Sequence, residues 1–241
     1  MRVHFIIHEP FEAPGTYQTW ARSRGYAITH SRMYAYEQLP EDIDAIDMLV
    51  IMGGPQSPAT TKEECPSFDA AAECACIARA IKAKKLVIGV CLGAQLVGET
   101  LGGRFEHSPE KEIGKFPIFL TEAGKNDPLF SLFGDSLDVG HWHSDMPGLT
   151  DAAIVIAKSG GCPRQIIRYQ DFVYGFQCHM EFTTEVVRGL VQASRDELSA
   201  SASLRFVQPV ETLLTQDYQE MNQKLYHFLD ALTTEYQRRT T

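Results

Sequence analysis

The sequence lacks several features that would point to a membrane or to nucleic acid. Its 241 residues contain no apolar run of about 18 residues, the length that a membrane-spanning helix needs. Met1–Ile7 is too short and wrongly flanked for a signal peptide, and it predicts a first strand instead. The net charge of −9 comes without a basic cluster, which argues against nucleic acid as a main partner. We therefore expect a cytoplasmic protein that binds neither membranes nor nucleic acid.

Metal-binding and nucleotide-binding patterns are also missing. Six cysteines occur, but Cys74 and Cys76 have no second pair at zinc-ligand spacing. Without a signal peptide, the thiols are expected to stay reduced rather than form a disulfide framework. No Gly-x-x-x-x-Gly-Lys phosphate loop is present, and Ser159–Gly161 runs into Cys162 and a proline, which indicates a turn. The sequence thus predicts neither a metal nor another cofactor.

What is present is an alternation of short β-type runs with longer helical stretches. The predicted strands are Val3–His8, Ala27–Ser31, Met48–Met52 and Leu86–Val90, and the predicted helices between and after them are Thr16–Arg24, Pro66–Lys84 and Leu92–Leu101. This alternation is typical of an α/β fold with an open, mostly parallel central sheet and helices on both faces. In such sheets the ligand site lies beyond the carboxyl ends of the strands.

The pattern changes in the second half of the chain. Between about residues 103 and 177, short strands such as Ile113–Leu120 are separated by turns, which predicts antiparallel additions to the sheet. Thr183–Gln192 returns to a helix, and Ser194–Ser203 resembles a helical connector or a loose linker. Val210–Tyr236 has apolar residues at helical spacing, which predicts one or two helices. We expect one domain over residues 1–195, with a helical extension over 196–241 packed on it.

Residues 89–93, Gly-Val-Cys-Leu-Gly, are the most informative segment. They follow a buried strand and precede a helix, so they predict a nucleophile elbow with Cys91 at its apex. The small neighbours permit a strained backbone, and the helix N-terminus favours a thiolate. A cysteine in this position is suited to attack on a carbonyl carbon.

A cysteine nucleophile needs a base, a group that orients the base, and donors for the oxyanion. His179 and Glu181 are two residues apart, so both project from one face of an extended segment. In isolation this pair would indicate a buried histidine near a surface carboxylate, but beside an elbow it predicts a catalytic dyad. Gly53-Gly54 is by itself only a tight turn, yet it can present N–H groups to a negative charge, together with the N–H of Leu92.

Three segments, in this order, resemble the signatures of class I glutamine amidotransferases. They are Gly53–Pro55, Gly89–Leu96 and Gly175–Glu181, and the resemblance covers roughly residues 1–190. The pattern is most similar to the amidotransferase part of GMP synthase and to its free-standing relatives. Gly140–Asp145 resembles the family segment that contacts the α-amino and α-carboxylate groups of glutamine. Glu112–Pro117 resembles a strand entry of the free-standing members.

The resemblance implies a flavodoxin-like fold and a glutamine-hydrolysing site. The implied catalytic residues are Cys91, His179 and Glu181, the implied oxyanion-hole residues are Gly54 and Leu92, and the implied substrate-binding residues are Gly53, Gln95, His143, Ser144 and Asp145. Two residues depart from the family pattern. Met180 stands where a proline is usual, and Cys178 replaces a bulky apolar residue, where period two turns it away from the face of His179.

The implied activity is cysteine-dependent hydrolysis of the glutamine side-chain amide to glutamate and ammonia. One alternative is a free-standing hydrolase of γ-glutamyl peptides or amides. A non-catalytic binding protein that keeps the fold is a second alternative, and the intact Cys91, His179 and Glu181 argue against it. A chaperone-like or protease-like relative ranks last, because that group lacks this His-x-Glu. The sequence does not decide whether the partner is a separate synthase subunit or a second copy of the chain. It also does not decide whether a partner is needed to order Gly53-Gly54.

Overall fold

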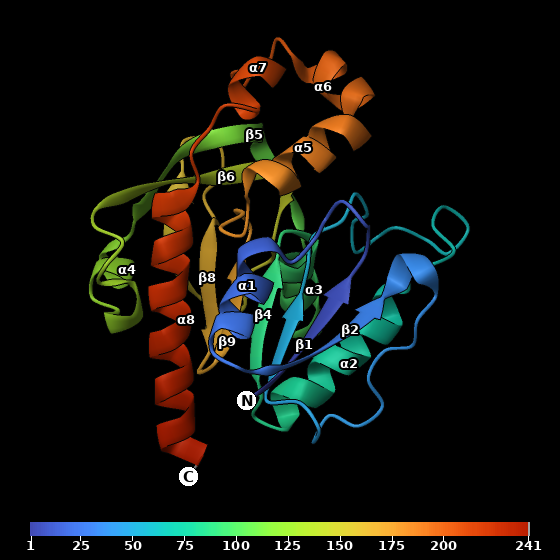
Figure 1. Cartoon of the computed structure of the whole chain (residues 1–241), viewed down its shortest axis with the longest axis vertical. Coiled ribbons are helices and arrows are strands. Elements are labelled where there is room, and N and C mark those ends of the chain that lie inside the picture. The colour runs from blue at the N-terminus through green and yellow to red at the C-terminus, as the bar shows by residue number, and fades with distance from the viewer. Residues whose placement is uncertain (241) are drawn as a thin grey trace.

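The computed structural model describes residues 1–240 as one mixed sheet with helices on both faces (Figure 1). Its strands are β1 (Arg2–Ile7), β2 (Ala27–Arg32), β3 (Met48–Ile51), β4 (Leu86–Val90), β5 (Glu106–Leu120), β6 (Ser136–Met146), β7 (Ile154–Ser159), β8 (Ile166–Gln170), β9 (Val173–Phe176) and β10 (Phe206–Val207). Its helices are α1 (Gly15–Ser23), α2 (Ala70–Lys82), α3 (Leu92–Thr100), α4 (Glu122–Lys125), α5 (Thr184–Ala193), α6 (Arg195–Ser201), α7 (Val210–Leu213) and α8 (Gln219–Thr240). Short 3-10 turns occur at Met33–Ala35 and Pro128–Phe130.

The sheet joins a parallel half to an antiparallel half. Strands β2, β1, β3, β4 and β9 are neighbours in that order, and every pair among them is parallel. From β9 the sheet continues antiparallel through β8, β7 and β5, with β6 paired to β5. This arrangement confirms the predicted α/β class with antiparallel additions. Because the five parallel strands run the same way, their carboxyl ends meet at one edge.

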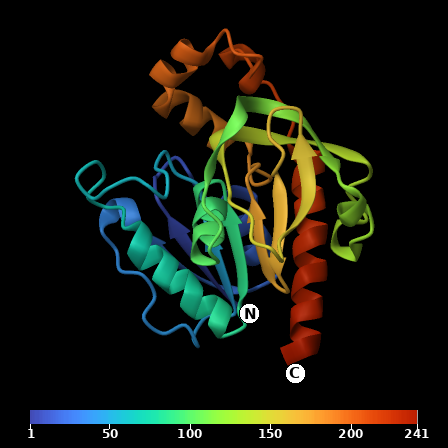
Figure 2. The same ribbon diagram turned by 180° about the vertical axis from the view of Figure 1, so that it is seen from behind.

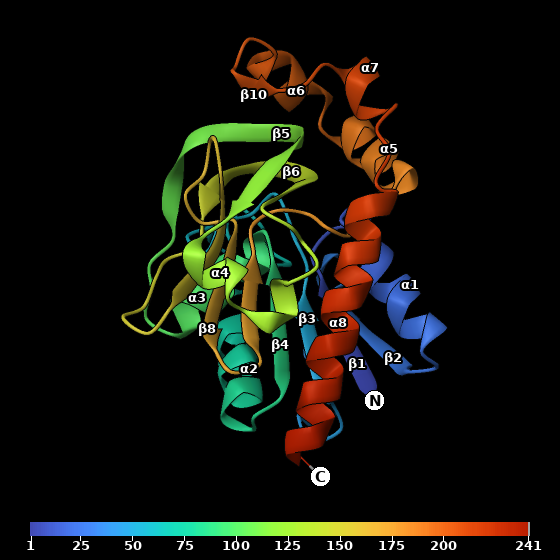
Figure 3. The same cartoon turned by 90° about the vertical axis from the view of Figure 1, so that its left-hand side faces the viewer.

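Alternating side chains of the parallel strands pack against two helical layers. Phe5 and Ile7 of β1 belong to a core cluster shared with α1 and α8, whereas Ile6 belongs to a cluster shared with α2 and α3. This alternation follows from the period of two in a strand. Figure 3 shows α1 and α8 on one side of the strands and α2 and α3 on the other. Within residues 1–240 no helix is long and apolar enough to cross a membrane.

Several predicted boundaries are corrected by local contacts. Helix α2 begins at Ala70 rather than near Pro66, because the Asp69 side chain accepts a hydrogen bond from the N–H of Ala72 and caps the helix. Strand β5 begins at Glu106 rather than at Ile113, since its pairing with β6 continues beyond a bulge. The stretch after Ser194, left open between helical connector and loose linker, forms helix α6.

The helices from α5 onward lie in two parts of the molecule. Helices α5, α6 and α7 lie together at one end of the molecule, at the top of Figures 1 and 2. Helix α8 returns along the sheet, and its Phe228 is fully buried against the rings of Phe130, Tyr174 and Phe176. The division into a domain over residues 1–195 and an extension over 196–241 stays a prediction, but the sheet and α8 share one hydrophobic cluster.

The Phe228→Ala variant tests how far α8 contributes to stability. Loss of a fully buried ring leaves a cavity, so we expect the free energy of unfolding to fall by about 3–5 kcal/mol. Urea denaturation followed by circular dichroism measures this change. Phe119, which is 44% exposed, provides the matched control. Phe119→Ala should cost less than about 1 kcal/mol, and an equal loss in both variants would contradict the packing of α8.

Candidate active site

Cys91 lies at a sharp turn between β4 and α3. Its backbone has φ 50° and ψ −110°, a left-handed conformation that is strained for a residue with a side chain. A Cβ on Gly89 would lie 2.3 Å from the carbonyl oxygen of Gly93, and a Cβ on Gly93 would lie 2.1 Å from that of Ile51. Only glycine fits at both positions, so the Gly-x-Cys-x-Gly pattern has a direct steric reason.

The sulfur of Cys91 is partly enclosed by polar groups. The Gln177 amide Nε2 lies 3.4 Å from Sγ and donates to it, and the carbonyl oxygen of Trp142 lies 3.8 Å from Sγ. Cys91 also occupies the N-terminal position of α3, where unpaired N–H groups favour a negative charge. The Gln177 donor and the helix N-terminus favour negative charge at this sulfur, whereas the Trp142 carbonyl can accept only from the neutral S–H.

His179 and Glu181 form a buried dyad beside Cys91. His179 Nδ1 lies 2.6 Å from Glu181 Oε1, and the His179 ring stacks on Phe182. Burial alone would lower the pKa of His179, but the Glu181 carboxylate and the Cys91 sulfur outweigh it, so this pKa is raised well above its usual value. The Nε2 atom is buried and has no hydrogen-bond partner among residues 1–240. The imidazole is therefore held through Nδ1, and its Nε2 is available for a further hydrogen bond.

The loop that carries the dyad is anchored by helix α1, near the N-terminus, and by the C-terminal helix α8. The loop follows β9 and makes a single antiparallel bridge between His179 and Gly140. At the start of α1, the Thr16 N–H and hydroxyl donate to the carbonyl oxygen of Glu181. On α8, the Asn222 amide donates to the carbonyl oxygens of Met180 and Phe182. These bonds set the position of the loop that carries His179 and Glu181 from outside the sheet.

The Gly53-Gly54 turn follows β3 and is braced by a buried ion pair. His8 Nδ1 donates to the carbonyl oxygen of Gly53 at 3.0 Å, and His8 Nε2 lies 2.8 Å from Glu73 Oε2. Burial would lower the pKa of His8, but the Glu73 carboxylate outweighs it and the pKa is raised. Since the peptide unit is planar and trans, the N–H of Gly54 points away from His8. Within residues 1–240 that N–H and the N–H of Leu92 make no hydrogen bond.

A cavity of about 510 Å³ opens over Cys91. Most of the residues predicted for substrate binding line it, together with a wall from the α5–α6 junction. The lining includes Gly54, Cys91, Gln95, Trp142, His143, Ser144, Asp145, Ser194, Asp196 and Glu197. Gly53, Leu92, His179 and Glu181 are not among the lining residues, so they lie behind this surface.

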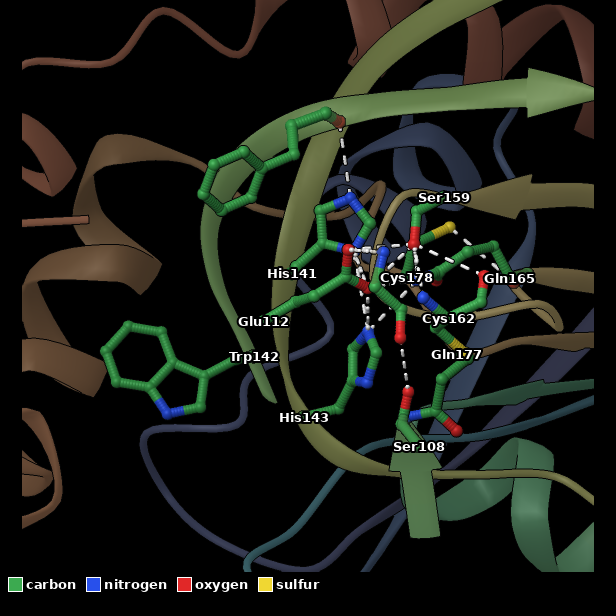
Figure 4. Close-up of polar contacts among 12 residues, drawn as sticks. Ser108, Glu112, His141, Trp142, His143, Ser159, Cys162, Gln165, Gln177 and Cys178 are labelled. Atoms are coloured by element: carbon green, nitrogen blue, oxygen red, sulfur yellow. Dashed lines mark hydrogen bonds and ion pairs between the residues drawn. The ribbon is translucent and has the colours of Figure 1, made fainter. Parts of the chain in front are cut away.

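Two of the predicted substrate-binding side chains already have partners within the protein. His143 Nε2 points to a buried cluster around Glu112 (Figure 4). The Asp145 carboxylate lies 2.6 Å from His107 Nδ1. The Gln95 amide nitrogen donates to Gln177, whereas its Oε1 is buried without a partner in the described chain. Of these side chains, Gln95 keeps an acceptor that a substrate could use.

Glu12 is a further residue of the site that sequence reasoning missed. Its Oε2 lies 2.7 Å from the place where a Cβ on Gly53 would be, and it lines the cavity. Burial raises the pKa of Glu12 to about 7, against the opposing charge of His179. Its location soon after the end of the first strand was the available signal, because that end lies at the same edge of the sheet as Cys91.

Comparison with known proteins agrees with this geometry. The profile of the family described as glutamine amidotransferase class-I matches residues 18–189. The chain belongs to the class I glutamine amidotransferase family.

Several relatives of this class I amidotransferase span nearly its whole length. It is 58% identical over 233 residues to the glutamine amidotransferase-like protein YfeJ of Salmonella typhimurium, with 97% of this chain and 98% of that protein covered. The crystal structure of a glutamine amidotransferase from Methylobacillus flagellatus has a TM-score of 0.85 at 27% identity and covers 97% of this chain and 94% of its own. A GMP synthase of Caldanaerobacter subterraneus is 29% identical over 72% of this chain, which corresponds to 33% of that protein.

The Glu12→Gln variant tests the buried carboxyl of this amidotransferase. The pKa of Glu12 rises from the ordinary 4.5 to about 7 in the folded protein. Folded Glu12 therefore keeps its proton where the unfolded chain has lost it, and wild-type stability falls as pH rises from about 4.5 to 7. Gln cannot ionise. The free energy of unfolding of the variant minus that of wild type should thus be about 2–3 kcal/mol larger at pH 8 than at pH 5.

Urea denaturation at the two pH values measures this difference. Glu63, which is exposed, supplies the matched control variant Glu63→Gln. A difference between Glu12→Gln and wild type that does not change with pH would contradict the burial of an ionisable carboxyl at this position.

Proposed function

We propose that this chain is a cysteine-dependent glutamine amidohydrolase, a glutaminase that releases glutamate and ammonia. The observation that supports this most strongly is the convergence of Cys91, on its strained turn, with the His179–Glu181 dyad. A nucleophile, a base and a group that orients the base are the three parts that thioester chemistry requires.

The proposed reaction begins with attack of the Cys91 thiolate on the side-chain carbonyl carbon of glutamine. The N–H groups of Gly54 and Leu92 stabilise the oxyanion of the tetrahedral intermediate. The intermediate collapses by breaking the C–N bond, and protonated His179 gives its Nε2 proton to the leaving nitrogen, which departs as ammonia. A glutamyl thioester remains on Cys91. His179 then removes a proton from water, which attacks the thioester and releases glutamate and the thiolate.

Two further observations favour hydrolysis by this chain without a partner subunit. The Gly53-Gly54 turn is braced by the chain's own His8–Glu73 pair, so its Gly54 N–H has a set direction. The cavity lining also includes the carboxylates of Asp145 and Asp196, whose charge suits the α-ammonium group of an amino acid. We assign Gln95, Ser144 and Asp145 to the amino-acid end of glutamine, together with the backbone around Gly53 and His143.

Reaction with a diazo-oxo-norleucine type of glutamine analogue tests the pocket and the nucleophile together. We expect one covalent adduct per chain by intact-mass spectrometry, no adduct with Cys91→Ala, and a full adduct with Cys178→Ala. Cys178 is the matched control because it is buried near the site, its sulfur lies 3.7 Å from the Gln165 carbonyl oxygen, and burial raises the pKa of its thiol.

Ammonia release from glutamine should fall at least about 1000-fold in Cys91→Ala, the scale of loss when a catalytic nucleophile is removed. Undiminished turnover in that variant, or labelling that follows Cys178, would overturn the proposed function.

A γ-glutamyl amide is the second candidate substrate, and the length of the cavity favours it. The lining continues past Trp142 to Ala193–Glu197, beyond the last residue of the family match. Asp196 there is exposed, while the Glu197 carboxylate is held by Lys111 Nζ at 2.6 Å and by Trp142 Nε1 at 3.0 Å. A leaving amine larger than ammonia has room in this end of the cavity, and a second amino group on it would meet a negative charge.

Two γ-glutamyl amides of equal length test this candidate, one made from a diamine and one from an uncharged alkylamine. Asp196→Asn should lower kcat/KM for the diamine amide by about 2–5-fold at low salt, as expected for one exposed charge, and leave the alkylamine amide unchanged. Asp151→Asn, an exposed change outside the cavity lining, serves as control. Turnover of free glutamine alone, with neither amide hydrolysed, would exclude the second candidate.

A further inference from the structure

A second polar cluster lies behind the cavity wall, between β5, β6 and the turn after β7. Glu112 on β5 pairs in register with His143 on β6, and His141 projects from the same face of β6 two residues earlier. All three side chains are buried, and Figure 4 shows them pointing toward one another while Trp142 points away. Neither His141 nor Glu112 has a place in the hydrolysis proposed above.

The distances within the cluster are too long for good hydrogen bonds. Glu112 Oε2 lies 3.3 Å from His143 Nε2 and 3.6 Å from His141 Nδ1, and the two nitrogens are 3.4 Å apart. N–H···O bonds normally fall at about 2.7–3.2 Å. Four ligands bonded at about 2.0–2.1 Å to a tetrahedral zinc ion lie roughly 3.3–3.4 Å from one another. The spacing therefore matches three ligands around a small cation better than three groups bonded to each other.

The outer contacts of His141 and Glu112 resemble those that orient metal ligands, whereas His143 Nδ1 is buried without a hydrogen-bond partner within the described residues. His141 Nε2 lies 3.2 Å from the carbonyl oxygen of Phe116, so it carries a proton and leaves a lone pair on Nδ1, which faces Glu112. The Ser159 hydroxyl lies 2.8 Å from both carboxylate oxygens of Glu112, and Oε1 also accepts from the Gly161 N–H at 3.1 Å. Partners of this kind hold ligating imidazoles and carboxylates in place in metal sites.

The fourth side of the cluster is the Gln165 amide. Its Nε2 donates to Glu112 Oε2 at 2.7 Å and also faces His143 Nε2 at 3.2 Å, while its Oε1 is buried without a partner within the described residues. With a cation between Glu112 and His143, the amide would turn over and move to the ligand spacing of about 3.3–3.4 Å, so that Oε1 faces the ion. The turn would give this buried oxygen a partner.

Charge leads to the same conclusion. Glu112 is fully buried, and within residues 1–240 its ion pairs are with the two histidines and not with any Lys or Arg. Its hydrogen-bond donors, Ser159, Gly161 and Gln165, are neutral, so a cation would compensate the buried negative charge that they leave in place.

We propose that Glu112, His141 and His143 bind one zinc ion, with the Gln165 amide oxygen as the fourth ligand. The site is closed, so the ion has a structural role: it joins β5 to β6 behind Trp142, whose carbonyl oxygen contacts the sulfur of Cys91. The proposal does not depend on which amide the chain hydrolyses, because metal binding is measured without substrate.

The full chain, expressed without a polyhistidine tag, is dialysed against a chelator and then titrated with ZnCl₂ against a chromophoric competitor. We expect one zinc per chain by elemental analysis after removal of excess metal. Glu112→Gln removes the carboxylate, and His141→Gln removes Nδ1 while it keeps an N–H near Phe116. Both should weaken zinc binding by at least about 100-fold. His107→Gln, an exposed histidine with a carboxylate partner, should bind zinc as wild type does.

A second measurement uses only the wild-type protein, so it does not depend on the variants folding. Zinc at about 100 times its Kd should raise Tm by roughly 5–10 °C relative to the chelator-treated protein. Cobalt(II) in the same site should give the strong visible absorption of tetrahedral coordination. Folded wild-type protein that takes up no zinc and shows no shift would overturn the proposal, as would full zinc binding by folded Glu112→Gln and His141→Gln.

Discussion

The strained backbone at Cys91 is the constraint on which the rest of the site depends. A left-handed residue with a side chain costs about 1–3 kcal/mol, and it persists only where the surrounding structure leaves no alternative. Here β3, β4 and α3 approach so closely at Gly89 and Gly93 that the chain must turn sharply at Cys91. The Cys91 N–H donates to the carbonyl oxygen of Phe176 at the end of β9, which leads directly to His179. One backbone geometry thus sets both the position of the thiol and its relation to the imidazole.

Buried carboxylates paired with histidines recur around this edge of the sheet. Glu181 orients His179, Glu73 holds His8 under the Gly53 carbonyl, and Glu112 faces His141 and His143 behind the wall that carries Trp142. Burying a charge is unfavourable unless it is paired or hydrogen-bonded, so each carboxylate restricts where its imidazole can be. Glu12, whose nearest charges are His179 and Glu181, lacks such a dedicated partner, and its pKa rises to about 7. Buried carboxylates and histidines, whose desolvation is energetically unfavourable, are thus concentrated around the proposed active site.

The C-terminal helices contribute contacts both to the central core and to the candidate active site. Phe228 of α8 lies among the rings of the central core, and Asn222 of the same helix holds the loop of Met180 and Phe182 in place. The α5–α6 junction supplies one wall of the cavity, including Asp196 and Glu197. The helices after residue 195 therefore hold the loop of His179 and Glu181 in place and limit the volume of the cavity over Cys91.

The local sequence determined those features that depend on neighbours in the chain. The α/β alternation, the turn at Cys91 and the spacing of His179 and Glu181 follow from periodicity, small residues and residue type, and the class I amidotransferase family was recognisable from them. Tertiary structure decided what depends on distant segments. Glu12, the His8–Glu73 brace, Asn222 and the Glu112–His141–His143 cluster lie tens of residues along the chain from their partners, 65 residues in the case of His8 and Glu73, so no short motif reveals them. The sequence predicted no metal site, because only closely spaced cysteines were considered as ligands. The proposed ligands meet only through the β5–β6 pairing, since strand register, and not proximity along the chain, brings a carboxylate opposite two imidazoles.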